Sequence, residues 1–303
     1  MYNVIKPMEA VMKNILWAYD GSKESEEALK ITKYFAGLFG SKVHGLYINH
    51  VSYPITPNFV YYAGYIEEAS HKKKLLIEKS FKKIKNDLSK TGIKFSGKTI
   101  KGDIDSGIKN YSEKIGADLI TVGNTGKDFL SRLVLGSNTV KILRSSEIPV
   151  LTVPSIKTKG KYSIKKILVP VEISENNHDS LDYAIEIAEK TNSHVTLLYI
   201  LSIPHNSRDI PPSVMDEIVS GSHRELNNLI SHAKEKNEYL RISKKLNIGL
   251  SPSTRILNYA KKNKFDLIVM NSNNKGNLAR FFLGSVSEDI IRGSVCPVLT
   301  VRK

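Results

Sequence analysis

Short apolar segments alternate with amphipathic segments along the chain, and the alternation occurs twice. The apolar runs of the first half lie at residues 15–19, 43–48, 94–100, 119–122 and 150–153. Between them, residues 25–39, about 67–90, 107–115 and 139–144 carry apolar residues at helical spacing. In the second half, apolar runs recur at residues 167–171, 195–201, 241–246, 267–270 and 298–301. Strands alternating with helices predict βαβ crossovers and a parallel sheet covered on both faces. We therefore expect two tandem, doubly wound, five-stranded α/β domains of Rossmann-like type.

Sequence blocks of the first half return in the second half in the same order. The segment ADLITVG at 117–123 resembles FDLIVMN at 265–271, and IPVLTV at 148–153 returns as CPVLTV at 296–301. The offset is nearly constant, which is the signature of an internal repeat. We expect one domain over residues 1–156 and a second over 162–303. The lysine-rich stretch between them, with Pro154 and Gly160 at its borders, is typical of a linker.

Composition narrows the class of protein. The chain has 303 residues, of which 41% are hydrophobic and 25% charged, so each half can bury a core. No apolar run approaches the roughly 18 residues of a membrane span, and the N-terminus has no signal-peptide pattern, so we expect a cytoplasmic protein with no membrane partner. Cys296 is the one cysteine, which excludes an intrachain disulfide framework. The histidines show no metal-ligand spacing, so we expect no structural metal.

The formal net charge is +15, which permits two interpretations. One is binding to nucleic acid or to an acidic membrane. The other is a solvated lysine surface. Lysines crowd residues 72–85, where they alternate with apolar residues from Leu75 to Ile84, as on the outer face of an amphipathic helix. No nucleic-acid-binding motif accompanies them, so we favour the solvated surface and expect no nucleic-acid partner.

A glycine-rich segment follows the fourth strand of the first half. Gly123-Asn-Thr-Gly126 is separated by nine residues from Gly136-Ser137, which opens a helix. Glycines let a backbone approach a ligand closely, and successive free N–H groups form an anion-binding nest. Ser137 is expected to cap the helix, whose N-terminus favours negative charge, and Lys127 can add positive charge. The segment can therefore clasp a polyphosphate; the alternative is that its glycines only make turns.

Carboxylates follow two other strands at the same edge of the sheet. Asp20 ends the first strand, where it can accept hydrogen bonds from ribose or base groups. The alternative is that Asp20 caps the next helix, a role that Ser22 or Ser25 can fill equally. Asp103 and Asp105 follow the third strand, where they can hold a metal or orient water, or simply cap the next helix.

With these motifs in place, the chain from about residue 12 to 303 resembles a tandem universal stress protein. The family's nucleotide motif is Gly, two residues, Gly, nine residues, Gly and then Ser or Thr, with an aspartate closing the first strand. The resemblance implies an adenine nucleotide alpha hydrolase-like fold that binds ATP together with magnesium. The implied nucleotide-binding residues are Ala18, Tyr19, Asp20 and Ile48 around adenine and ribose, and Gly123, Thr125, Gly126, Lys127, Gly136, Ser137 and Asn138 around the phosphates.

The second copy departs from this pattern. Asn271 and Asn274 replace the two loop glycines, and Glu172 followed by Ile173 replaces the aspartate and its glycine. Asparagine tolerates left-handed backbone, but its side chain occupies space that a phosphate would need. We therefore expect a degenerate second copy, although Lys275-Gly276 can restore an anion site in a shifted register.

The expected function is that of an ATP-binding protein of stress response or signalling, whose nucleotide occupancy alters a surface read by a protein partner. No P-loop, nucleophile elbow or kinase signature marks a dedicated enzyme. The alternatives are slow ATP hydrolysis or phosphotransfer, and a nucleotide-independent chaperone-like or nucleic-acid-binding module. The resemblance also implies an intramolecular pseudo-dimer paired through residues 150–153 and 298–301, and leaves further association into a homodimer open.

Overall fold

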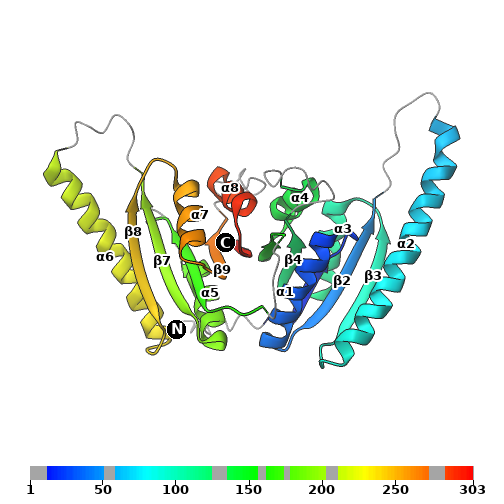
Figure 1. Cartoon of the computed structure of the whole chain (residues 1–303), viewed down its shortest axis with the longest axis horizontal. Coiled ribbons are helices and arrows are strands. Elements are labelled where there is room, and N and C mark those ends of the chain that lie inside the picture. Colours follow the sequence, from blue (N-terminus) through cyan, green and yellow to red (C-terminus); the bar gives the residue numbers. More distant parts are fainter. Residues whose placement is uncertain are drawn as a thin grey trace, which may run out of the picture.

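The computed structural model describes residues 12–50, 59–124, 135–155, 162–173, 178–202, 211–272 and 284–302. The first copy comprises β1 (Asn14–Ala18), α1 (Lys23–Phe39), β2 (Lys42–Asn49), α2 (Phe59–Ser89), β3 (Phe95–Lys101), α3 (Ile104–Ile115), β4 (Leu119–Gly123), α4 (Ser137–Ser145) and β5 (Val150–Val153). The second comprises β6 (Lys166–Val171), α5 (His178–Thr191), β7 (His194–Leu201), α6 (Pro212–Lys236), β8 (Ile242–Ile248), α7 (Pro252–Lys262), β9 (Leu267–Asn271), α8 (Ser285–Gly293) and β10 (Val298–Val301). Figure 1 shows the two copies side by side, each with its own helices around its strands.

The predicted alternation of strands and helices is confirmed, with one large difference in extent. Helix α2 begins at Phe59, eight residues before the predicted start at 67. Its first described side chains give no apolar periodicity because most of them face solvent; Tyr65, for example, is exposed.

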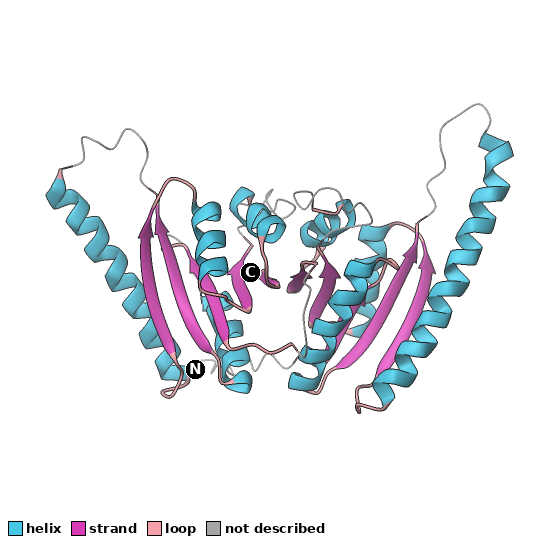
Figure 2. Cartoon of the chain, viewed as in Figure 1, coloured by secondary structure: helices cyan, strands magenta, loops and turns pink. Residues whose placement is uncertain are grey.

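The ten strands form one continuous sheet in the order β3-β2-β1-β4-β5-β10-β9-β6-β7-β8. All neighbouring strands are parallel except β5 and β10, which pair antiparallel with Leu151 opposite Leu299. These are the two segments through which the resemblance expected the copies to meet. Figure 2 shows the resulting arrangement, in which the two parallel halves join at the centre of the molecule. The two expected five-stranded sheets are thus halves of a single sheet.

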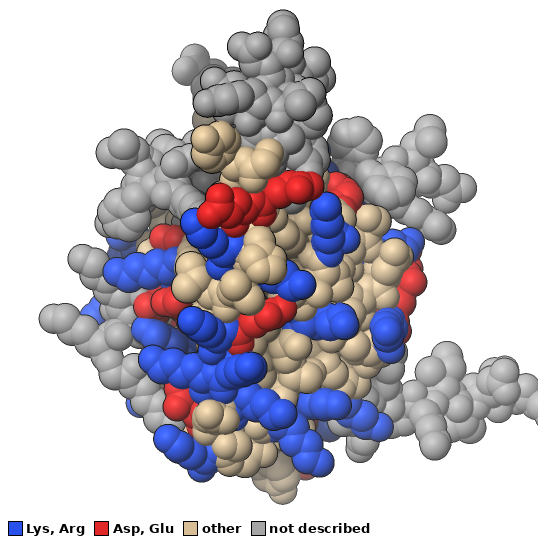
Figure 3. Space-filling view, turned by 90° about the vertical axis from the view of Figure 1, so that its right-hand side faces the viewer, with Lys and Arg blue, Asp and Glu red and all other residues tan. Residues whose placement is uncertain are grey.

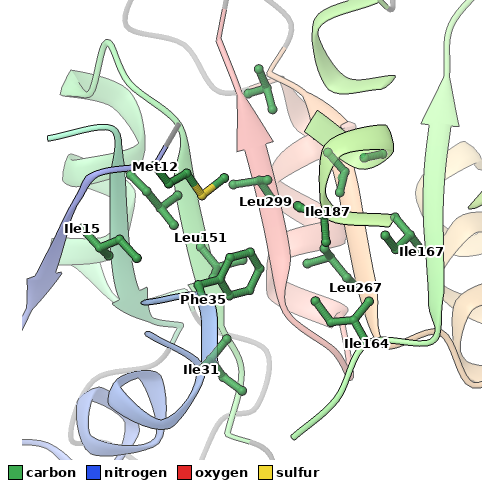
Figure 4. Close-up of a cluster of buried hydrophobic side chains, with 14 of the residues drawn as sticks. Met12, Ile15, Ile31, Phe35, Leu151, Ile164, Ile167, Ile187, Leu267 and Leu299 are labelled. Carbon is green, nitrogen blue, oxygen red and sulfur yellow. The ribbon is translucent and has the colours of Figure 1, made fainter. Parts of the chain in front are cut away.

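Helices cover both faces of this sheet, as a doubly wound fold requires. Side chains from α1, α2, α5 and α6 pack with one set of strand residues, and side chains from α3, α4, α7 and α8 pack with the alternate set. Each hydrophobic core continues from one copy into the other. Figure 4 shows this junction, where Phe35 and Leu151 of the first copy face Leu299 and Ile187 of the second. All four side chains are fully buried, and each such burial stabilises the fold by about 1.5–3 kcal/mol.

Helix α2 carries the lysine-rich segment of residues 72–85. Ile77, Phe81 and Leu88 point inward and are buried, whereas most of its lysines are exposed. Figure 3 shows Lys and Arg side chains spread over this side of the molecule. The ion pair between Lys72 and Glu68, at 2.7 Å, has both side chains largely in water and therefore contributes little stability. Within the described residues, no helix is long and apolar enough to cross a membrane.

Two side-chain hydrogen bonds between the copies have acceptors at equivalent positions of the repeat, but their donors are different residues. Leu143 in the last turn of α4 and Ile291 in the last turn of α8 occupy matching positions of the repeat. The amide of Asn124 donates to the carbonyl oxygen of Ile291 at 2.5 Å, and the guanidinium of Arg302 donates to the carbonyl oxygen of Leu143. Because the last carbonyls of a helix lack partners within it, each copy completes the end of a helix in the other.

Candidate functional site

A cleft opens where β1 and β4 separate at their carboxyl ends. These strands are neighbours, but the chain leaves β1 toward β2 on one side and leaves β4 toward β5 on the other. Their pairing ends at Trp17 and Thr121, and a cavity of about 120 Å³ lies beyond that point. Ligands of open α/β sheets bind at such a switch point.

The structure brings most of the sequence-predicted site residues together in this cleft. Its lining includes Ala18, Tyr19, Asp20, Ile48, Gly123, Gly136, Ser137 and Asn138. The other three, Thr125, Gly126 and Lys127, lie outside the described residues. Sequence reasoning missed the apolar wall, which Leu46, Ile108, Val122 and Ile142 supply. A sequence signal for this wall was present, because these four residues belong to the apolar pattern from which the strands and helices were predicted.

Asp20 lies in a tightly organised turn between β1 and α1. Its Oδ1 accepts a hydrogen bond from the backbone N–H of Ser22 at 2.8 Å, across Gly21, whose φ of 80° favours glycine. Ser22 caps α1 by accepting from the N–H of Ser25 at 3.1 Å. The capping alternative for Asp20 is therefore wrong. The carboxylate of Asp20 instead stabilises the turn between β1 and α1, and Asp20 lines the cleft.

Tyr19 belongs to the hydrophobic core as well as to the cleft. Its ring lies 4.5 Å from that of Trp17 and 5.6 Å from that of Phe81, measured between centroids. Burial raises the pKa of the Tyr19 hydroxyl above its ordinary value of 10.0. Its ring therefore packs in the core beside the cleft, and its backbone N–H donates to the Leu46 oxygen at 2.9 Å.

The start of α4 forms the opposite side of the cleft. The capping position is occupied by Gly136, with φ −57° and ψ 135°, and no side chain caps the helix. The prediction that Ser137 is the cap is wrong: the extended backbone of Gly136 makes Ser137 the first helical residue. The first helical hydrogen bond runs from Val140 N–H to the Gly136 oxygen at 3.0 Å. The N–H groups of Ser137, Asn138 and Thr139 therefore have no acceptor within the helix, and they carry the positive end of its dipole.

Gly123 has a packing role that the sequence did not reveal. A methyl group at this position would lie 2.9 Å from the carbonyl carbon and 3.0 Å from the oxygen of Glu24, in the first turn of α1. Only glycine lets that turn approach β4 so closely. Thr139 also donates its hydroxyl to the Gly123 oxygen at 2.8 Å, and Gly136 N–H donates to the Asn124 oxygen at 3.1 Å. These bonds fix the start of α4 against the end of β4.

The aspartates after β3 have different positions from those expected of a metal site. Asp103 caps α3 and accepts from the N–H groups of Asp105 and Ser106 at 3.0 and 3.3 Å. The backbone hydrogen bond from Ser106 is the main reason that the pKa of Asp103 is lowered from 3.8. Neither aspartate lines the cleft. Across the described part of the chain, no group of three or more His, Cys, Asp or Glu is arranged to hold a metal ion.

The corresponding position in the second copy is built differently. Asn271 stands where the first copy has Gly123, and its Oδ1 accepts from the N–H of Ser180 at the start of α5, at 3.1 Å. The asparagine side chain thus contacts the start of α5 on the side where, in the first copy, the first turn of α1 packs directly against the backbone of Gly123. Asn274 and the segment Lys275-Gly276 lie outside the described residues.

The fold is that of two tandem adenine nucleotide alpha hydrolase-like domains, with a largely parallel sheet, helices on both faces and a cleft at the switch point of the first copy. The chain belongs to the universal stress protein family, whose sequence profile matches residues 12–154 and 163–302.

Individual relatives agree with this assignment. A universal stress protein of Methanocaldococcus jannaschii is 32% identical over 160 residues, which cover 49% of this chain and 88% of that protein. One of Mycolicibacterium smegmatis is 23% identical over 294 residues, covering 95% of this chain and 96% of its own. The crystal structure of a universal stress protein from Archaeoglobus fulgidus superposes with a TM-score of 0.69 at 21% identity, covering 97% of both chains. The last similarity concerns the fold alone and extends across both copies.

Proposed function

We propose that this protein binds ATP in the cleft of its first copy and acts as a nucleotide-responsive protein of stress response or signalling. The observation that carries the proposal is the meeting of two features across one cleft. Asp20 supplies a carboxylate on one side, suited to the hydroxyl groups of ribose, and the uncapped start of α4 supplies amides on the other, suited to phosphate. Apolar residues between them, including Val122 and Ile142, suit an adenine ring.

Magnesium fits this arrangement as a companion of the phosphates. The described residues provide no cluster of carboxylates for it, so its ligands would be phosphate oxygens and water, which Mg²⁺ commonly retains. The ion would reduce the negative charge that the amides of α4 must balance. No ligand set from the protein is required for this role.

The second copy is not expected to bind a triphosphate. The side chain of Asn271 is engaged with the start of α5, where the first copy has the bare backbone of Gly123. We therefore expect one ATP per chain, with the second copy completing the sheet and both hydrophobic cores.

A titration of the full-length chain with ATP and magnesium tests the proposal. Isothermal titration calorimetry is expected to give one equivalent bound per chain. Asp20→Asn keeps an oxygen for the Ser22 N–H but removes the charge, and is expected to weaken ATP about tenfold or more. The matched variant Glu172→Gln in the second copy is expected to leave ATP affinity unchanged. Two equivalents would contradict the assignment to one copy, and no binding would refute the proposal.

A further inference from the structure

Helix α2 exposes two leucines among its lysines. The helix lies at one end of the molecule, against β3 at the edge of the sheet (Figure 1). Ile77 and Phe81 point toward the sheet and are buried, whereas Leu75 is 46% exposed and Leu76 is 63% exposed. The side of α2 that the sequence assigned to solvent therefore includes an apolar spot.

The leucines and the lysines share one face of the helix. Positions separated by three, four or seven residues lie side by side on a helix. Exposed residues of α2 at this spacing form what we call the outward face: Lys72, Leu75, Leu76, Lys79, Lys82, Lys83 and Asn86. The leucines have lysines before and after them, and no carboxylate belongs to the face. Lysines combined with large apolar residues are typical of helices that bind at a membrane surface.

Most lysines of the outward face have no neighbouring carboxylate. Lys72 pairs with Glu68 at 2.7 Å. Among the described residues, Lys79, Lys82 and Lys83 form no ion pair, and all three are exposed. Figure 3 views this end of the molecule and shows Lys and Arg side chains gathered on it. Their positive charge is therefore available to an anionic partner.

The second copy has no comparable basic face. Helix α6 lies against β8, at the opposite edge of the sheet. Its sequence has three lysines and arginines and four carboxylates, whereas that of α2 has seven lysines and four carboxylates. The fold therefore does not require a basic helix at this place, and the excess of positive charge belongs to one end of the molecule.

We propose that the outward face of α2 binds the surface of a membrane rich in anionic lipids. Leu75 and Leu76 insert between the head groups, and the lysines around them attract the lipid phosphates and carboxylates. Nucleic acid is a poorer match, because α2 has no arginine to bind phosphate through paired hydrogen bonds, and the leucines have no role against a phosphate backbone. This binding does not depend on ATP in the first copy.

Co-sedimentation of the full-length protein with lipid vesicles tests the proposal. Vesicles of equal parts phosphatidylserine and phosphatidylcholine are expected to bind the protein at least tenfold more tightly than vesicles of phosphatidylcholine alone. Raising the salt from about 0.1 M to about 1 M shortens the Debye length from about 10 Å to about 3 Å and is expected to release the protein. The net charge of +15 attracts the whole molecule to anionic surfaces, so variants are needed to locate the contact.

The triple variant K79Q/K82Q/K83Q tests the lysines. A lysine near an anionic membrane strengthens binding about fivefold, so this variant is expected to bind the anionic vesicles about 100-fold more weakly.

The matched control is K245Q/K261Q/K262Q, which removes the same charge from exposed lysines of the second copy. Its affinity is expected to stay within about twofold, because charges more than a Debye length from the membrane are screened.

The double variant L75Q/L76Q tests the apolar spot at constant charge. It is expected to weaken binding to the anionic vesicles at least fivefold, and circular dichroism establishes that each variant is folded. Equal losses in the two triple variants, unchanged binding in the leucine variant, or no binding to anionic vesicles would each overturn the proposal. Lysine-dependent binding to duplex DNA in place of vesicles would also overturn it and would identify nucleic acid as the partner.

Discussion

Replacing Ser137 by proline removes one amide from the start of α4 while preserving the helix. Proline is favoured at the first position of a helix, because the N–H that it lacks has no partner there. The residue before proline must be extended, and the ψ of 135° at Gly136 already satisfies this restriction. The free energy of unfolding is therefore expected to change by no more than about 0.5 kcal/mol.

The same substitution is expected to weaken ATP binding strongly. A hydrogen bond to a charged group contributes about 1.5–3 kcal/mol, so losing the amide of residue 137 should lower the affinity by about 10- to 150-fold. Isothermal titration calorimetry of the full-length chain measures the change directly. Ser137→Ala removes only the hydroxyl group and separates its contribution from that of the amide.

The repeat provides a matched control for this experiment. Ser285→Pro makes the same change at the start of α8, where Gly284 also has an extended backbone with ψ 147°. This variant is expected to bind ATP as the unmodified protein does. If Ser137→Pro bound ATP as tightly as Ser137→Ala, the start of α4 would not hold the phosphates.

Three further predictions concern stability and reactivity. Gly123→Ala forces a methyl group against the backbone of Glu24 and should lower the free energy of unfolding by about 1–3 kcal/mol in urea; Gly37→Ala, in open space on α1, should raise it by about 0.5–1 kcal/mol. Burial and a neighbouring positive charge lower the pKa of His44 from 6.5, so the unfolded chain binds its proton more readily and stability falls as pH drops below about 6.5. Urea titrations between about pH 5 and 8 should show a shallower fall in His44→Gln. Burial raises the pKa of Cys296 to about 11, so its thiol should react with Ellman's reagent at least about 100-fold more slowly in the folded than in the unfolded protein.

The strands and helices were predictable because each buries a regular pattern of apolar residues. The starts of two helices were not predicted, because no such pattern of apolar residues marks them. Helix α2 extends through an exposed segment that includes Tyr65, and α4 begins after a glycine that has no capping side chain. The start of α4 depends on the backbone conformation of Gly136 rather than on periodicity. The union of the halves into one sheet was expected from family resemblance and not from any pattern within the strands.

The candidate site was predictable in its composition but not in its packing. The spacing of Gly123, Gly136 and Ser137 identified residues that meet in one cleft. Gly123 also lets the first turn of α1 pack closely against β4, and only the position of that helix in the structure shows this. The pairing of β6 with β9, which ends at Leu168 and Ile268, did have a sequence signal, since Pro170 lies within a predicted central strand, where proline cannot donate to the neighbouring strand.

The two copies meet through one symmetric contact and two asymmetric ones. Strands β5 and β10 pair through equivalent residues, with Thr152 donating to the Val298 oxygen and Thr300 donating to the Val150 oxygen. In a symmetric pair of identical domains, Leu143 and Ile291 would receive the same donor. Here the Leu143 carbonyl receives Arg302 from the end of the chain, whereas the Ile291 carbonyl receives Asn124, which directly follows β4 at the edge of the first cleft. Asn124 therefore joins the end of β4 to the last turn of α8, whereas the other donor, Arg302, follows β10. The fused chain thus combines the strand pairing of a symmetric dimer with two helix-end contacts that differ between its halves.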